Sequence, residues 1–351
     1  MKQTTHVMAV AAALMFSAVG ASTGLTAAAA KTLDIYFIDV EGGQSTLIVT
    51  PAGQSLLIDT GYPSLGGRDP DRIMAAARDA HVTRIDYLLI THFHEDHDGG
   101  AAELSRRIPI GTFIDDGSPV ETTSDVLAAF NAYEGARNKG QHLMPKPGDR
   151  LPLRGADVEV VTAAGTTLSA PLSGGGQPNP VCAEFVRRPD RPFDENSTSL
   201  GVRVRFGAFR FLDLGDLPWN RLGDLVCPNN LLGEADVYLV AHHANNDSNV
   251  PAFLAAVRPR VAILNNGAYK GGAAGALASL HTTPALESVW QLHRSLNDGA
   301  DNFPEAFIAN PYGGDMDTAA WIKLSASDDG RFSVTNGRTG WTRSYDVPGT
   351  P

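Results

Sequence analysis

Cysteine is scarce in this chain of 351 residues, which contains only Cys182 and Cys227. The two lie far apart and show no CxxC spacing, so the sequence argues against a cysteine-based zinc site. A disulfide between them is plausible in an oxidising compartment, where it would tether the loop before residue 196 to the loop after residue 216. The sequence leaves this pairing open, because a disulfide depends on the distance between the two backbones.

An excess of basic residues is also absent. Lysine and arginine total 28 against 39 aspartates and glutamates, which gives a formal net charge of −11. Loss of Lys2 with a leader peptide would make the charge −11 − 1 = −12. Nucleic-acid binding requires a basic surface, so the composition does not favour a nucleic-acid partner, although uneven charge remains compatible with one.

Charged side chains are nearly missing from residues 1–30, where Lys2 is the single one. The apolar run at residues 7–20 is too short to cross a bilayer easily, and small residues at 27–30 offer a cleavage site. We therefore expect a signal peptide at 1–30 and a secreted or periplasmic mature chain at 31–351. An uncleaved membrane anchor is the alternative, and no later segment has a transmembrane pattern.

Histidine, by contrast, is concentrated at residues 91–100, whose sequence is THFHEDHDGG. The apolar segment at 85–90 predicts a buried strand before it, and the two glycines after it allow a sharp turn into a helix. Imidazole and carboxylate suit zinc and similar divalent metals, and burying several of them without a partner is costly. The cluster therefore predicts a metal site; a histidine-rich surface loop is the alternative.

The spacing within this cluster suits two adjacent metals. His92 and His94 are two residues apart, so an extended strand end would direct both to one side. Asp96 and His97 follow on the turn and can reach a second point nearby. Two metals about 3.5–4 Å apart can share a bridging hydroxide, which is a nucleophile at neutral pH.

These residues resemble the metallo-β-lactamase superfamily, whose signature is His-x-His-x-Asp-His after a strand. Three further segments are similar to superfamily motifs and follow in the same order as theirs: IDTG at 58–61, LGD at 214–216 and AHH at 241–243. The resemblance covers most of the mature chain. It implies an α/β fold, the αββα four-layer sandwich with two sheets face to face and helices outside, and a dinuclear zinc hydrolase, with Mn²⁺ as the other metal to consider.

Two more segments narrow the resemblance. DIYFIDVEGGQSTLIV at 34–49 and ENSTSL at 195–200 are similar to the hydrolase domain of competence-type DNA-uptake proteins. That group usually continues with Gly-Ser after its paired histidines, whereas Ala244 follows here. Many superfamily members also carry another histidine for the first metal. Only His142 lies in that interval, in a loop-like context, so the resemblance implies fewer protein ligands there, or help from Asn196.

The resemblance also assigns roles to individual residues. The implied metal ligands are His92, His94, Asp96, His97, Asp216 and His243. Asp216 would bridge the metals, while His242 would bind substrate or donate a proton, so Asp96 and His242 are the expected catalytic residues. Asp59, and in the same way Asp39, would orient ligands, although a strand-end turn accounts equally well for Asp39. Asn196 would contact substrate or cap a turn. Two polar neighbours are expected to be solvated or to tune the charge of the site: Glu95 and Asp98. Two histidines are expected to be structural or, at most, to line the cleft: His281 and His293.

Sheet and helix signals alternate along the mature chain, as a sandwich of this kind requires. Strands are expected at 33–40, 44–49, 54–59, 85–90, 110–114, 158–162, 199–206, 209–214, 237–240 and 261–264, with a last hairpin at 321–324 and 331–335. Helices are expected at 71–80, 101–107, 124–139, 251–257 and 284–295. Loop insertions near 165–196 and 265–283 would wall the substrate cleft.

The leading hypothesis is an exported hydrolase that uses a metal-bound hydroxide on a phosphodiester. A lactone, another ester or a β-lactam is the alternative small-molecule substrate, although Asp216 in place of a cysteine argues against the commonest zinc β-lactamases. A non-catalytic metal-binding protein that keeps the fold is the alternative from another class.

Overall fold

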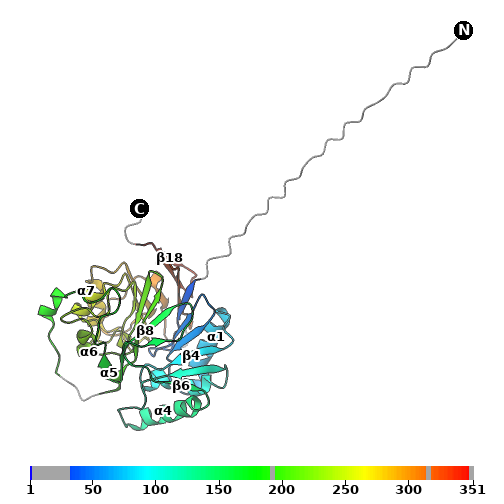
Figure 1. The fold of residues 1–351 in the computed structure, drawn as a ribbon, viewed down its shortest axis with the longest axis horizontal. Coiled ribbons are helices and arrows are strands. Elements are labelled where there is room, and N and C mark those ends of the chain that lie inside the picture. Colours follow the sequence, from blue (N-terminus) through cyan, green and yellow to red (C-terminus); the bar gives the residue numbers. More distant parts are fainter. Residues whose placement is uncertain (2–31, 190–193, 314–317, 348–351) are drawn as a thin grey trace. The chain divides into compact units, whose positions relative to one another are not determined.

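The computed structural model describes Met1 and residues 32–189, 194–313 and 318–347. The expected signal peptide therefore lies, apart from Met1, outside the described residues. Residues from 32 onward form two large sheets with helices packed on their outer faces, and Figure 1 labels the main elements. The αββα expectation is confirmed. Among the described residues, no helix has the length and apolar character needed to cross a membrane.

The first sheet has the strand order β18-β17-β16-β1-β2-β3-β4-β5-β6, and it is parallel from β3 to β6 and antiparallel elsewhere. Its strands are β1 (Leu33–Phe37), β2 (Thr46–Val49), β3 (Ser55–Ile58), β4 (Ile85–Leu89), β5 (Ile110–Ile114), β6 (Gln141–Leu143), β16 (Ile322–Ala326), β17 (Phe332–Asn336) and β18 (Thr342–Tyr345).

The second sheet has the order β15-β14-β13-β12-β11-β10-β8-β7, with β9 paired to β8, and it is parallel from β11 to β15. Its strands are β7 (Arg150–Leu151), β8 (Asp157–Ala163), β9 (Thr166–Thr167), β10 (Gly201–Phe206), β11 (Phe209–Asp213), β12 (Val237–Leu239), β13 (Val261–Leu264), β14 (Ser288–His293) and β15 (Ile308–Asn310).

The helices divide between the two outer faces. Apolar side chains of α1, α3 and α4 pack on the first sheet, and those of α6, α7 and α8 pack on the second. The α-helices are α1 (Arg68–Asp79), α2 (Glu95–Asp98), α3 (Ala101–Leu104), α4 (Ser124–Arg137), α5 (Glu195–Thr198), α6 (Trp219–Asp224), α7 (Pro251–Val257) and α8 (Ala274–His281). The 3₁₀ helices are η1 (Leu65–Gly67), η2 (Pro180–Glu184), η3 (His242–Ala244) and η4 (Glu305–Phe307).

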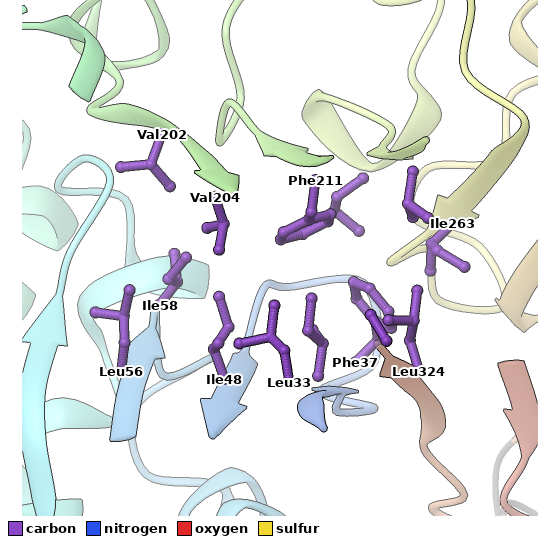
Figure 2. Close-up of a cluster of buried hydrophobic side chains, with 14 of the residues drawn as sticks. Leu33, Phe37, Ile48, Leu56, Ile58, Val202, Val204, Phe211, Ile263 and Leu324 are labelled. Atoms are coloured by element: carbon purple, nitrogen blue, oxygen red, sulfur yellow. The ribbon is translucent and has the colours of Figure 1, made fainter. Parts of the chain in front are cut away.

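The core between the sheets follows from strand alternation. In β1, Leu33 and Phe37 face the second sheet, while Tyr36 faces the helices on the other side. Figure 2 shows side chains of the two sheets meeting, with Phe37 on one side and Phe211 on the other. Their ring centroids are 5.7 Å apart in an edge-on arrangement. Burial of such large apolar side chains stabilises the pairing of the sheets by roughly 1.5–3 kcal/mol each.

One expected helix is wrong. Residues 284–295 contain strand β14, which pairs in parallel with β13. Trp290 on one face packs into the core between the sheets, and Val289 on the other face packs under the helices. This strand is buried on both faces, so its sequence, SVWQLH, lacks the regular apolar–polar alternation that would distinguish it from a helix. Conversely, α8 occupies part of the insertion expected as loop at 265–283.

The strand ends that matter for function meet at one edge. Parallel β3 and β4 end at residues 58 and 89, and parallel β11 and β12 end at residues 213 and 239. The expected motifs follow each of these ends directly. Because parallel strands bring their carboxyl ends to the same sheet edge, residues distant in sequence are gathered there.

Candidate metal centre

Four buried side chains from two halves of the chain converge at this edge. One ligand atom each from Asp96, His97, Asp216 and His243 lies within 4.8 Å of the others. The Nε2 atom of His243 is 3.1 Å from Oδ2 of both Asp96 and Asp216. The Nε2 atom of His97 is 3.2 Å and 3.3 Å from the same two oxygens. Two imidazole nitrogens and two carboxylate oxygens thus face one point.

The orientation of His97 is set by residues at the ends of β3 and β4. Its Nδ1 donates to Oδ2 of Asp59 over 2.7 Å. Asp59 also accepts from the backbone nitrogen of Thr91 over 2.8 Å and from its hydroxyl over 2.7 Å. This directs Nε2 of His97 to the cluster, which is the orienting geometry that the resemblance implies for Asp59.

The charged groups of the cluster shift one another's pKa values. Burial alone would raise the pKa of Asp96 and Asp216, yet the neighbouring imidazoles hold the pKa of both carboxyls well below the usual range. Burial would lower the pKa of His97, yet the carboxylates of Asp216, Asp96 and Asp59 raise that pKa well above its ordinary value. The carboxylates therefore stabilise positive charge at this point.

His92 and His94 lie beside the four-residue cluster and do not belong to it. The Nε2 atom of His92 is 3.1 Å from Nδ1 of His94, and Nε2 of His94 is 3.5 Å from the carboxylate of Glu121. His92 is fully buried, and burial followed by the positive charge of His97 lowers its pKa well below the ordinary value. His92 and His94 thus stand apart from Asp96 and His97, and their binding of a separate metal stays a prediction.

The paired histidines on η3 differ in environment. His243 is buried in the cluster, whereas Nδ1 of His242 lies 2.8 Å from Oδ1 of Asp247. The Nε2 atom of His242 is 3.8 Å from Oδ2 of Asp216 and 3.3 Å from Nδ2 of Asn196. Burial would lower the pKa of His242, but the charges of Asp216 and Asp247 raise it. His242 therefore lies at the rim of the cluster with one nitrogen fixed by a carboxylate.

Asn196 reaches the site by its side chain. It lies on α5, and the capping role considered for it belongs to Asp194, whose carboxylate accepts from the backbone nitrogen of Ser197 over 3.0 Å. Its Oδ1 atom is buried and makes no hydrogen bond in the described structure. Asn196 is thus placed to contact a bound group.

For two acidic residues the structure decides against one of the two expected roles. Asp39 contacts none of the expected ligands: its carboxylate pairs with His293 and Arg72 and accepts from the backbone nitrogen of Glu41, so the strand-end turn is the correct account. Asp98 is buried, and burial raises its pKa well above the usual range, so of its two expected roles the solvated one is wrong. Asp98 is buried at the end of α2, which sequence spacing alone did not indicate.

Three other histidines lie away from this cluster. His142 lies on β6 rather than in a loop, and its Nε2 is 2.8 Å from Oδ1 of Asp115. His293 lies on β14, and His281 stacks on Phe303 with ring centroids 4.0 Å apart. None of the three lies in the four-residue cluster.

Sequence reasoning missed a cation beside the cluster. Lys270 forms an ion pair with Oδ2 of Asp96 and donates to the hydroxyl of Tyr62 over 3.0 Å. Its approach requires Gly271, which has a φ of +73° and where a Cβ would lie 2.1 Å from the backbone oxygen of His243. The Gly-Gly pair at 271–272 was the available signal, because such glycines mark close approach of two backbones.

Two residues from the other motifs hold the histidine-rich loop at residues 91–100 in place. Gln44 donates its backbone nitrogen to the carbonyl of Asp96 over 3.0 Å, and a Cβ on neighbouring Gly43 would lie 2.6 Å from that carbonyl. Glu195 accepts from the backbone nitrogen of Phe93 over 3.2 Å. The 34–49 and 195–200 segments therefore brace the loop on both sides.

A divalent metal fits this donor set. Nε2 of His97, Nε2 of His243 and Oδ1 of Asp216 are buried and make no hydrogen bond in the described structure. Buried polar atoms without partners are costly, and imidazole with carboxylate is the donor set of zinc, manganese and iron centres. These residues would satisfy their unpaired atoms by binding such an ion.

Comparison with known proteins agrees with this geometry. Residues 38–191 match the family model described as metallo-beta-lactamase superfamily. Competence protein ComA of Neisseria gonorrhoeae is 29% identical over 259 residues, which cover 73% of this chain. The match spans 29% of that relative's length. The expected resemblance to this superfamily and to competence-type proteins is confirmed.

Some solved structures match the chain at low identity and low structural similarity. The metallo-beta-lactamase fold protein YhfI from Bacillus subtilis is 10% identical, with a TM-score of 0.46, and the match covers 74% of this chain and 96% of that one. CmlA, a diiron beta-hydroxylase from Streptomyces venezuelae, is 14% identical, with a TM-score of 0.37, covering 74% of this chain and 48% of that one.

Proposed function

From the premise that residues 38–191 belong to the metallo-β-lactamase superfamily, we propose that this chain is a hydrolase that uses two divalent metal ions, zinc in the first instance, to cleave a phosphodiester. The observation that supports it most directly is the convergence of Asp96, His97, Asp216 and His243 within 4.8 Å. The similarity to ComA favours a relation to the competence-type hydrolases. That match spans 29% of the length of ComA.

The four-residue cluster would hold one ion, and His92 with His94 would contribute to a second. Divalent ions at such a centre lower the pKa of bound water and neutralise the charge that develops on the substrate oxygens. Asp59 keeps His97 in the orientation that binding requires, through the hydrogen bond to Nδ1. Lys270 adds a cation beside Asp96, where it would bind a non-bridging phosphoryl oxygen.

His242 is placed to act on the leaving group. Nδ1 of His242 lies 2.8 Å from a carboxylate oxygen of Asp247, which leaves Nε2 on the side of Asp216 and Asn196. When water adds to phosphorus and the ester P–O bond breaks, Nε2 of His242 would donate its proton to the departing oxygen. Asn196 would keep His242 or the substrate in position during that proton transfer.

The test combines elemental analysis with hydrolysis of bis(p-nitrophenyl) phosphate by the purified chain. We expect about two metal ions per chain and turnover, both lost on chelation and restored on readdition. The Asp216→Asn variant should lose metal and turnover together, whereas Asp34→Asn, on β1, should keep both.

Other outcomes separate the alternatives. Turnover of a lactone, another ester or a β-lactam without any phosphodiester turnover would replace the substrate class and keep the hydrolase. Bound metal with no turnover of any of these compounds would favour a metal-binding protein without catalysis. Full activity in Asp216→Asn would mean that the chemistry lies elsewhere.

We also propose that the chain is exported. The apolar segment and small residues at 1–30 support a signal peptide, and the disulfide between Cys182 and Cys227 suits an oxidising compartment. Cell fractionation with an antibody against the mature chain tests this, and recovery of the full-length chain from the cytoplasm would contradict it.

A further inference from the structure

A cavity of about 330 Å³ lies next to the candidate metal centre, on the side of His242. Asp247, which holds His242, lines it, and so does Ser197, the neighbour of Asn196. Its outer wall consists of Arg188 and helix α6 with Trp219. A volume of this size accommodates part of a small-molecule ligand. Residues that contact His242 or adjoin Asn196 thus also line this cavity.

Arg188 is fixed in the wall of this cavity by several contacts. Its guanidinium lies over the ring of Trp219, 3.9 Å from the ring centroid, and donates to the backbone oxygen of Asn246 over 2.9 Å. Its backbone exchanges two hydrogen bonds with the side chain of Asn220, at 2.9 Å and 3.0 Å. Little side-chain entropy would be lost when this guanidinium binds a ligand.

The surrounding segment is held to α6 as well. Trp219 donates from Nε1 to the backbone oxygen of Val186 over 3.0 Å. The disulfide between Cys182 and Cys227 joins the same segment to the residues just after α6. These contacts therefore fix the backbone position from which the Arg188 side chain extends.

Among the residues that the structure describes, the carboxylates around the cavity pair with groups other than Arg188. Arg187 and Arg221 both lie within ion-pair distance of Asp224. The two carboxylates in the cavity are engaged elsewhere: Asp194 accepts from Ser197, and Asp247 pairs with His242. Within the described ranges, no carboxylate forms an ion pair with Arg188.

We propose that this cavity binds a second anionic group of the substrate, and that Arg188 recognises it. The substrate class is then a small phosphodiester that carries a further phosphate or carboxylate, a conclusion that rests on the proposed phosphodiester hydrolysis. A planar guanidinium with free N–H groups suits two-point binding of either anion. The net charge of −11 disfavours a long polyanion and leaves a small dianion as the better fit.

The test uses two substrates with the same reacting group. Thymidine 5′-(4-nitrophenyl phosphate) and its 3′-phosphorylated form both release 4-nitrophenol. We expect the wild-type chain to show a KM about tenfold to a hundredfold lower for the 3′-phosphorylated form. Arg188→Met, which keeps the apolar stem over Trp219, should bring the two KM values together. Arg188→Lys should restore part of the difference, and Arg331→Met, on a distant turn, should retain all of it.

Binding provides a readout that does not depend on turnover. In calorimetric titrations of the zinc-loaded chain, thymidine 3′,5′-bisphosphate should bind at least about tenfold more tightly than thymidine 5′-phosphate, and Arg188→Met should remove that preference. Equal affinities in the wild-type chain, or a preference unchanged by Arg188→Met, would overturn the inference. An Arg188-dependent preference without phosphodiester cleavage would reject the proposed reaction and retain the anion site. Cleavage without the preference would reject only the anion site.

Discussion

Asp59 and His97 lie 38 residues apart and are joined by a hydrogen bond of 2.7 Å between Oδ2 and Nδ1. The bond crosses from the end of β3 to the loop after β4, and both side chains are fully buried. It aims the other nitrogen of His97 at Asp96 and Asp216. The orientation of His97 in the cluster therefore depends on Asp59, which is not one of the four clustered residues.

Removing this carboxylate should weaken metal binding. In Asp59→Asn, the imidazole loses its charged acceptor, and we expect zinc affinity to fall about tenfold to a hundredfold. Competition with a coloured chelator measures this. Asp34→Asn, which alters a carboxylate on β1 paired with Lys323, is the matched control and should bind zinc normally. Unchanged affinity in Asp59→Asn would show that packing alone orients His97.

Loss of the Lys270 cation should affect turnover more than metal content. We expect Lys270→Met to lower kcat/KM for bis(p-nitrophenyl) phosphate by about tenfold to a hundredfold, since the charge developing on phosphoryl oxygen loses a partner. Zinc content should not fall, because Lys270 competes with metal for Asp96. Lys270→Arg should recover part of the rate, and Lys323→Met serves as control. A normal rate in Lys270→Met would leave this lysine a structural role.

Reduction of the disulfide should destabilise the chain without emptying the metal centre. Cys182 and Cys227 close a loop of 45 residues, and the loss of such a crosslink costs about 2–4 kcal/mol of unfolding free energy. Urea unfolding of the wild-type chain and of the double Cys→Ser variant measures the difference. Equal unfolding midpoints would mean that packing of the 182–189 segment on α6 suffices without the crosslink.

Stability should fall as pH rises from about 4 to 7, in part through Asp116. Burial, followed by the charges of Glu195 and Asp115, raises the pKa of Asp116 from 3.8 to about 7. The folded chain then keeps a proton that the unfolded chain releases, so the penalty is absent below pH 4 and complete above pH 7. It amounts to on the order of 4 kcal/mol.

Asp116→Asn should remove this part of the pH dependence. Urea unfolding at pH 5 and pH 8 should show a smaller loss of stability in the variant than in the wild-type chain. The same substitution at Asp301, whose side chain is 83% exposed, should leave the wild-type difference in place. If Asp116→Asn lost as much stability between these two pH values as the wild-type chain, the pH dependence would belong to other buried carboxyls, including Asp213.

Much of the fold was predictable because its signals are local. The strands at 110–114 and 261–264 and the helix at 251–257 have the expected bounds, since apolar runs bounded by turn residues or Pro251 define them. The order of strand, histidine cluster and glycine pair also lies in consecutive residues. That order, with one motif before it and two after it, was enough to predict the family, the sandwich and a metal site.

The tertiary structure alone decided which polar residues share a partner. It assigned Asp39 to His293, 254 positions away, brought Lys270 to Asp96, and buried Asp98, although the sequence around each residue looks like an ordinary turn. It also made β14 a strand, because pairing with β13 supplies hydrogen bonds that a local apolar run cannot reveal. The sequence determined the chemistry available, and long-range packing determined which groups lie close enough to use it.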